Sequence, residues 1–248
     1  MATTYNIFDL QVYDRATGLA VNTTGGQLIA TATGAYARST LYNPDSDYAA
    51  ISGNVVSATR GKYRFAVVNT GLGSPALDVF GFAPGGHFFF VKNVKPASIT
   101  DIWIDSNKLE QLAIVPFSMA DATAATEKDT GLDFTTGMTI MPFTAVDVRT
   151  VDSGKTIDFG LLSSESGGDA DGFVAAASVA TAAVVQAKCA ATATLGALLR
   201  ETVVADAGTA SVRHSYTVGA TAVSLTYTIS SGSTTAAGYM RIPYTLKF

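Results

Sequence analysis

Cysteine is almost missing from this sequence: its 248 residues include only one, Cys189. A single thiol excludes any disulfide within the chain. Cys189 stands among small apolar residues in VVQAKCAATA. That setting favours a buried small side chain over a nucleophile.

Charge is also scarce. Asp, Glu, Lys and Arg make up 15% of the residues, against the roughly 25% that is usual in soluble domains. The net charge is −4 and no cluster of Lys and Arg occurs. Nucleic-acid binding is therefore disfavoured, because it requires a basic surface that displaces counterions from phosphates. Ala, Thr, Ser and Gly replace the charged residues, and such a surface favours contact with other proteins.

Long apolar runs are lacking as well. None approaches the roughly 18 residues that a membrane-spanning helix needs, so no membrane association is expected. The opening MATTYNIFDL lacks the basic segment and apolar core of a secretion signal. We therefore expect a protein that is made in the cytoplasm.

Residues typical of catalytic sites are few. Neither His87 nor His214 has a Cys, His or Asp at metal-ligand spacing, so both are expected at strand ends or turns. The sequence contains no G-x-S-x-G elbow and no phosphate-binding G-x-x-x-x-G-K-[ST] loop. These absences predict a protein that is not an enzyme and carries no cofactor.

The dominant pattern is the alternation of apolar and hydroxyl residues. In VSLTYTIS, residues 223–230, Val, Leu, Tyr and Ile point to one face and Ser and Thr to the other. KYRFAVVN, KTIDFGLL and YNIFDLQVYD alternate in the same way. Turn signals such as NTTGG, NPDSD and VDSG separate such runs, roughly every ten to twenty residues. The pattern predicts an all-β protein built as a sandwich or barrel.

Two β units are expected, with a boundary near residue 120. The stretch SMADATAATEKDTG, residues 118–131, is small and polar and follows the apolar run LAIVPF. We assign residues 1–120 to an N-terminal β domain and residues 121–248 to a C-terminal β-sandwich, with one continuous sandwich as the alternative. Residues 173–202 are rich in alanine, but their β-branched residues favour two or three strands over a helix.

The densest group of acids and glycines lies in SSESGGDADGF, residues 163–173. If Gly172 were the invariant glycine of an EF-hand, Asp169 and Asp171 would stand at ligand positions. However, Gly167 and Ser178 would stand at the first and last positions, where calcium-binding loops carry acids. The segment is therefore not an EF-hand.

Three readings of this acidic loop remain. Glu165, Asp169 and Asp171 are candidates for a looser calcium site, because carboxylate oxygens are the ligands that calcium prefers. Glu165 and Asp171 could instead face each other as a glycosidase pair, although no aromatic sugar platform stands nearby in the sequence. We favour a third reading, a turn in which the Asp side chains bond to backbone N–H groups.

The C-terminal half resembles a known family. TIDFGLLSSESGGDADGFVAAASVATAAVV, then TLGALLRE, then SLTYTISSGSTTAAGYMRIPY, resembles a β module of tailed-bacteriophage structural proteins. It is similar to proteins that decorate or cement the capsid. The matching region is about residues 156–244, and YNIFDLQVYDRATG resembles the opening strand of such proteins.

The resemblance implies a β-sandwich or jelly-roll fold, a homo-oligomer that is often a trimer, and no catalysis. The partners would be the major capsid protein and other virion subunits, and the location would be the virion, assembled in the host bacterial cytoplasm. A tail, baseplate or head-fibre component and a carbohydrate-binding or carbohydrate-active protein are the alternatives. We expect residues 2–14 to form an arm that adds a strand to a neighbour, and the exposed Ser and Thr faces to contact other subunits.

Overall fold

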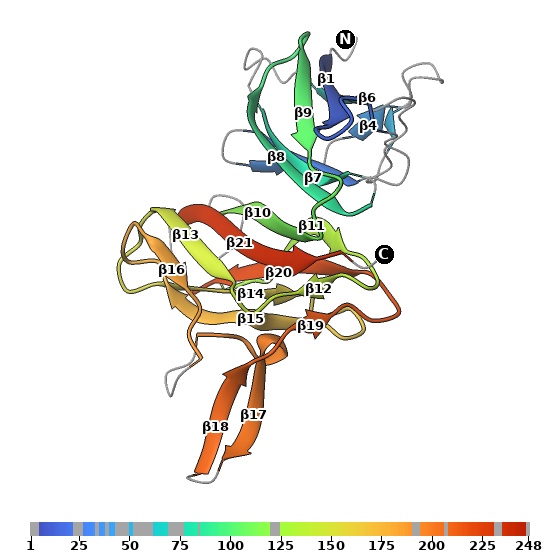
Figure 1. The fold of residues 1–248 in the computed structure, drawn as a ribbon. Coiled ribbons are helices and arrows are strands. Elements are labelled where there is room, and N and C mark those ends of the chain that lie inside the picture. The colour runs from blue at the N-terminus through green and yellow to red at the C-terminus, as the bar shows by residue number, and fades with distance from the viewer. Residues whose placement is uncertain are drawn as a thin grey trace. The chain divides into compact units, whose positions relative to one another are not determined.

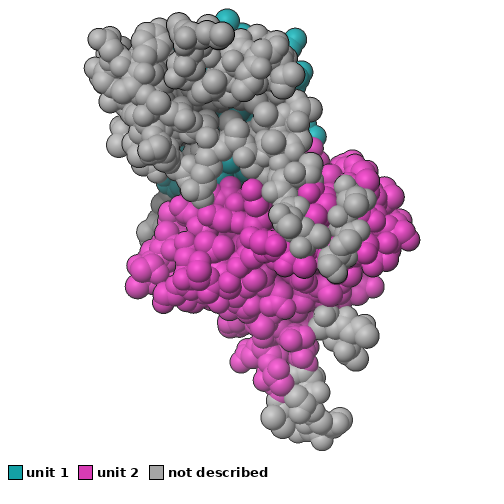
Figure 2. Space-filling view, turned by 180° about the vertical axis from the view of Figure 1, so that it is seen from behind, with its two compact units in different colours: residues 1–108 teal, residues 109–248 magenta. Residues whose placement is uncertain are grey.

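The computed structural model describes residues 5–21, 27–32, 35–37, 40–42, 50–51, 62–68, 77–83, 85–119, 125–189, 194–205, 208–230 and 235–246. The chain divides into two compact units, Met1–Lys108 and Leu109–Phe248 (Figure 2). Strands dominate both units (Figure 1), as the alternating sequence predicts. In the part of the chain that the structure describes, no helix is long and apolar enough to span a membrane.

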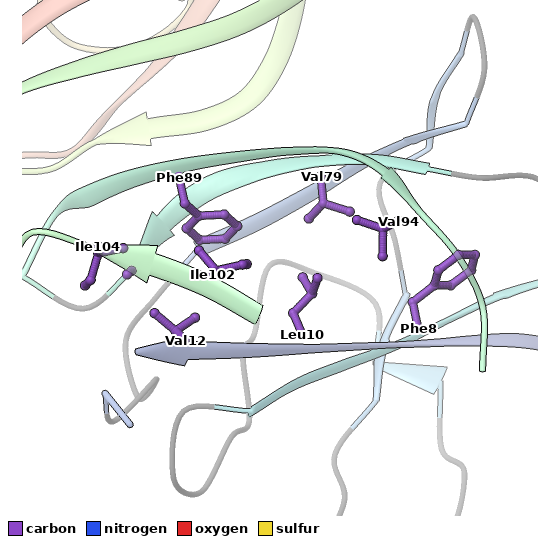
Figure 3. Close-up of a cluster of buried hydrophobic side chains, with 9 residues drawn as sticks. Phe8, Leu10, Val12, Val79, Phe89, Val94, Ile102 and Ile104 are labelled. Carbon is purple, nitrogen blue, oxygen red and sulfur yellow. The ribbon is translucent and has the colours of Figure 1, made fainter. Parts of the chain in front are cut away.

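The first unit is built from two sheets. Its strands are β1 Tyr5–Asp14, β2 Gln27–Ala32, β3 Ala35–Ala37, β4 Thr40–Tyr42, β5 Ala50–Ile51, β6 Lys62–Val68, β7 Leu77–Ala83, β8 His87–Val94 and β9 Ile99–Ile104. One sheet has the order β5-β4-β6-β1-β9 and the other the order β3-β2-β7-β8. The core lies between them (Figure 3) and includes the buried side chains of Phe8, Leu10, Val12, Val79, Phe89, Val94, Ile102 and Ile104.

Strand β1 is interior to its sheet. It pairs with β6 in antiparallel fashion on one edge and with β9 in parallel fashion on the other. Its alternate residues Phe8, Leu10 and Val12 are fully buried. The prediction of a free arm is therefore wrong for residues 5–14, whose backbone groups are bonded within the chain, while residues 2–4 lie outside the described part.

The second unit is a β-sandwich. Its strands are β10 Glu110–Ser118, β11 Lys128–Phe134, β12 Thr139–Ile140, β13 Ala145–Thr150, β14 Thr156–Leu161, β15 Asp169–Ser178, β16 Val184–Gln186, β17 Arg200–Ala205, β18 Gly208–Arg213, β19 Tyr216–Thr217, β20 Val223–Ile229 and β21 Ala237–Thr245. One sheet has the order β16-β13-β21-β12-β19, with β10 also on β21, and the other has the order β11-β20-β14-β15. The strands β17 and β18 form a separate hairpin.

Aromatic side chains join the two sheets of the sandwich. The ring centroids of Phe117 and Tyr227 lie 6.2 Å apart, and those of Phe134 and Tyr244 lie 6.1 Å apart. The Tyr227 hydroxyl also donates a hydrogen bond to the Ser118 carbonyl at 3.2 Å. The predicted all-β, sandwich-like architecture is thus confirmed.

The boundary between the units precedes β10 rather than following it. The sequence suggested a cut near residue 120, which would assign β10 to the first unit. Instead β10 pairs along its whole length with β21, from Glu110 opposite Thr245 to Ser118 opposite Ala237. A pairing between segments so far apart in the chain leaves no local sign in the sequence.

The alanine-rich stretch of residues 173–202 contains no α-helix in its described part, as its β-branched residues predicted. It contributes to β15, β16 and β17, with one 3₁₀ turn, η1, at Ala197–Leu199. The expectation of exposed hydroxyl faces fails on β20, where Ser224 and Thr226 are buried. Strand β20 lies between β11 and β14, and these hydroxyls bond to neighbouring strands rather than to water.

Candidate functional site

The acidic loop begins as two consecutive turns. The Glu165 N–H donates to the Leu162 carbonyl at 3.0 Å, and the Gly168 N–H donates to the Glu165 carbonyl at 2.9 Å. Gly167 has a φ of +84°, which side-chain-bearing residues rarely adopt. At Gly168 a side chain would collide with the Leu162 carbonyl. The predicted turn is therefore present at residues 163–168, whereas residues 169–173, predicted as part of it, begin strand β15.

The Glu165 side chain fastens this turn to β20. Its carboxylate accepts the Ser224 N–H at 2.6 Å and lies 3.1 Å from the Ser224 hydroxyl, which is also 2.7 Å from Asp133 Oδ1. Beside it, the Glu127 carboxylate accepts the Ser163 N–H at 2.9 Å and the Ser163 hydroxyl at 2.5 Å. These carboxylates are used in bonds that hold the loop on the sandwich.

The two aspartates of the loop have other neighbours. Burial raises the pKa of Asp169, and a hydrogen bond with Asp171 and the negative charge of Asp171 raise it further. Burial also raises the pKa of Asp158 on β14. The Ala176 N–H, which donates to Asp158 Oδ1 at 2.5 Å, opposes that shift by stabilising the carboxylate. Asp169 and Asp171 thus lie together, while Glu165 is bonded elsewhere.

This arrangement bears on both chemical readings of the loop. Among the residues that the structure describes, no three Asp, Glu, His or Cys side chains form a group that could hold a metal ion. Glu165, Asp169 and Asp171 therefore do not make one calcium ligand set. Glu165 and Asp171 have separate hydrogen-bond partners, which are Ser224 for Glu165 and Asp169 for Asp171.

A second buried acid, Asp147 on β13, serves the fold. Its Oδ2 atom lies 2.5 Å from Arg241 Nη2 and 2.8 Å from Arg149 Nη2. Burial alone would raise the pKa of Asp147, but the hydrogen bonds and charges of the two arginines outweigh it and hold that pKa below its ordinary value. The ion pair joins neighbouring strands β13 and β21.

The histidines occupy the positions that the sequence predicted. His87 is the first residue of β8 and is buried, with no hydrogen-bond partner for Nδ1. Burial lowers its pKa, although the charges of Asp14 and Asp105 oppose that shift. His214 follows β18, is about half-exposed, and places Nδ1 3.7 Å from Glu201 Oε2. Among the residues that the structure describes, neither histidine contacts a Ser or Cys side chain as a catalytic imidazole would.

Cys189 is less buried than the sequence suggested. It is only partly buried, and its thiol donates to the Ser211 carbonyl at 3.0 Å. That contact joins the sandwich to the β17–β18 hairpin.

The hairpin β17–β18 extends from the sandwich (Figure 1) and has no third strand in the described part of the chain. Its six residue pairs run from Arg200 opposite Arg213 to Ala205 opposite Gly208. The base is held by the Arg213 guanidinium, which donates to the carbonyls of Pro142 and Ala187 and lies 5.4 Å from the Phe143 ring centroid.

Glycines of the acidic loop also position this hairpin. A side chain at Gly172 would collide with Leu198 of η1, and one at Gly196 would collide with the backbone of Asp171 and Gly172. The Gly196 N–H donates to the Phe173 carbonyl at 3.0 Å. The end of the acidic loop therefore packs directly on the segment that enters the hairpin.

Sequence reasoning missed one surface feature, in the first unit. The rings of Tyr13 on β1 and Trp103 on β9 are stacked, with centroids 4.9 Å apart. Nothing in the local sequence joins them, because they are ninety residues apart and meet only through strand pairing. In ITDIWI, the alternation puts Trp103 on one face of the strand and the apolar Ile102 and Ile104 on the other. That signal could have identified Trp103 as outward-facing.

Comparisons with known proteins add no family assignment. Searches with this chain against protein-family models, curated proteins and solved structures found no match.

Proposed function

We propose that this protein is a structural component of a tailed-bacteriophage virion, one that decorates the capsid and bridges neighbouring shell subunits. The observation that carries the proposal is the β17–β18 hairpin. It is anchored at its base and has no third strand among the described residues. A two-stranded hairpin is only marginally stable alone in water, so further strands or packing from a partner would stabilise it.

The composition of the hairpin supports a protein partner. Between Thr202 and Ser211 the sequence TVVADAGTAS carries a single charge, on Asp206. Unpaired strand edges with few charges are suited to pairing with another chain, whereas proteins that avoid such pairing commonly place Lys or Pro at those edges. The major capsid protein, other virion subunits or further copies of this chain in a trimer are the proposed partners.

The use of polar groups in the sandwich also supports a structural role. Glu165, Glu127 and Asp147 all bond to neighbouring segments of the fold. A decoration protein would bind through many copies, so weak contacts at each copy would add through avidity. The resemblance of residues 156–244 to phage structural modules agrees with this function.

Immunogold electron microscopy of purified particles from a phage that encodes this chain would test the proposal. Labelling of the head shell is the expected result. Labelling of the tail or baseplate would favour the alternative virion location, and the absence of the chain from purified particles would contradict both.

A hairpin variant gives a sharper test. Replacing residues 201–212 with a short Gly-Ser linker removes the hairpin and leaves Arg213 at its base. We expect the variant to keep the melting transition of the sandwich and to lose incorporation into particles. A matched control replaces Val184 with Ala, since this exposed residue lies on β16 outside the hairpin. Normal incorporation of the hairpin variant would show that the hairpin does not make the contact.

A further inference from the structure

The outer face of β9 in the first unit carries an exposed aromatic pair. Along β9, Ile102 and Ile104 are buried, each with 4% of its surface exposed, whereas Trp103 is 47% exposed. Tyr13 lies opposite Trp103 on the parallel neighbour β1. Their rings stack with centroids 4.9 Å apart and an angle of 23° between the ring planes. The stack fixes the indole in one orientation at the surface.

The near-parallel arrangement of the two rings favours a flat ligand. Quaternary ammonium ligands are recognised in cages of several aromatic rings, and these two rings do not enclose a space. One face of the indole packs on Tyr13, so a ligand is offered a single flat aromatic surface. A ring with an apolar face of C–H groups, such as a hexopyranose sugar, fits that surface by stacking.

Polar groups beside the indole are open to a ligand. Asp101 precedes Trp103 by two residues on the same face of β9, which places their Cα atoms about 7 Å apart. Asp101 is exposed and has no hydrogen-bond or ion-pair partner among the residues that the structure describes. A sugar hydroxyl can donate to this carboxylate in a charge-assisted hydrogen bond, and others can bond to the Trp103 N–H and the Tyr13 hydroxyl.

We infer that Tyr13, Trp103 and Asp101 form a binding site for an oligosaccharide, in which a hexopyranose ring stacks on Trp103 and its hydroxyls bond to Asp101. The site is non-catalytic, because it offers one carboxylate where glycoside hydrolysis uses two that face each other. The site belongs to the first unit, whereas the hairpin on which the proposed virion function rests belongs to the second, and the site does not depend on that function.

The sequence makes the test unusually direct, because Trp103 is the only tryptophan in the chain. The full chain would be titrated separately with cellohexaose, maltohexaose, chitohexaose and a β-1,4-galactan oligosaccharide, with indole emission as the readout. Saturable change with at least one of them, at concentrations up to about 10 mM, is the expected result. The absence of any saturable change with all four would overturn the inference.

Variants separate stacking from adventitious fluorescence changes. By titration calorimetry with the responding oligosaccharide, Trp103→Ala should weaken binding at least about tenfold, and Trp103→Phe should weaken it less because a ring face remains. Asp101→Asn should weaken binding about threefold or more. Phe143→Ala, which removes an exposed ring in the second unit, is the matched control and should bind as the original chain does.

Two outcomes of these variants would contradict the site. Unchanged affinity in Trp103→Ala would place the sugar elsewhere. An equal loss in Phe143→Ala would show non-specific adsorption to exposed rings. Circular dichroism melting of each variant would confirm that the fold is retained, so that a loss of binding reports the site itself.

Discussion

The acidic loop of the second unit and the aromatic pair of the first unit use their polar groups in opposite ways. In the loop, Glu165 bonds to Ser224, and Asp169 lies against Asp171. Beside the aromatic pair, Asp101 has no partner among the residues described. The acids of the loop are conspicuous in the sequence, but Glu165 and Asp169 are hydrogen-bonded within the fold. The aromatic pair is inconspicuous in the sequence, but Trp103 and Asp101 are exposed to solvent.

This difference shows why a dense run of acids is a weak sign of a binding site. A carboxylate that accepts two or three hydrogen bonds inside the fold has little capacity left for a ligand. Availability depends on the partners that folding brings to each side chain. Most of the following predictions compare a side chain that is buried or bonded within the fold with a chemically similar one that is exposed.

The largest effect is expected where an aromatic ring is buried. Phe173, which ends the acidic loop, is fully buried and its ring contacts those of Phe134 and Phe159. Phe173→Ala should lower the free energy of unfolding by about 3–5 kcal/mol through the cavity that it leaves. Trp103→Ala should lower it by less than about 1.5 kcal/mol, because about half of that side chain is already in water. Urea denaturation of both variants measures the difference, and equal losses would contradict the assignment of Trp103 to the surface.

The next comparison uses two aspartates. Asp147 is 4% exposed and bonds to Arg241, which is itself about a third exposed. Asp147→Ala should cost about 2–3 kcal/mol, less than for a fully buried pair because the freed arginine can reach water. Asp101→Ala should change stability by less than about 0.5 kcal/mol. A similar loss for both in chemical denaturation would mean that Asp101 has a structural partner.

The effects of removing two serine hydroxyls near the acidic loop can also be compared. Ser224→Ala removes the hydroxyl that lies between Glu165 and Asp133, and we expect a loss of about 1–2 kcal/mol. Ser164→Ala, in the exposed part of the loop, is the control and should stay within about 0.5 kcal/mol. The midpoint of urea unfolding checks both values, and an unaffected Ser224→Ala would argue against the loop being held through this contact.

The pH dependence of stability should report the burial of His87. The pKa of His87 lies below the ordinary value of 6.5 in the folded protein, so the unfolded chain binds the proton first as pH falls. Stability from this group should therefore decrease below about pH 6.5, by no more than about 1.4 kcal/mol per pH unit. Unfolding measured from pH 7.5 to 5.5 should have a shallower pH slope in His87→Gln than in the original chain. An unchanged slope in His87→Gln would contradict the role given to burial.

The smallest effect is expected from calcium. Because Glu165, Asp169 and Asp171 are not gathered as one ligand set, thermal melting in millimolar calcium and in a chelator should give the same transition temperature within error. A higher melting temperature with calcium that disappears in Asp169→Asn would restore the acidic loop as an ion site. Magnesium at the same ionic strength controls for charge screening.

Much of the strand pattern could be predicted from the sequence. The alternation in residues 156–161 and 223–229 identified β14 and β20, and the glycines of residues 163–173 identified the turn after β14. Local alternation is sufficient for this because side chains of a strand point to opposite faces with a period of two. The same alternation could not reveal that Ser224 and Thr226 are buried, since it says which residues share a face and not what covers that face.

Errors arose where the outcome depended on distant segments. Residues 5–14 were predicted as a free arm, but β6 and β9 occupy both edges of β1. The unit boundary was placed near residue 120, but β10 belongs with β21. In both cases the deciding hydrogen bonds join residues far apart in the chain, and local composition carries no record of them.

The sequence by itself determined that this chain folds into strands, that it is sparsely charged, and that a glycine-containing turn follows β14, although residues 169–173 of the predicted turn belong to β15. Only the tertiary structure decided which polar groups are used within the fold and which remain open. It closed Glu165 onto Ser224, paired Asp147 with Arg241, and set Tyr13 against Trp103 beside an unpartnered Asp101. The physical reason is that a polar group is satisfied by whichever partner folding brings near it, and those partners come from strands that pair across long stretches of sequence.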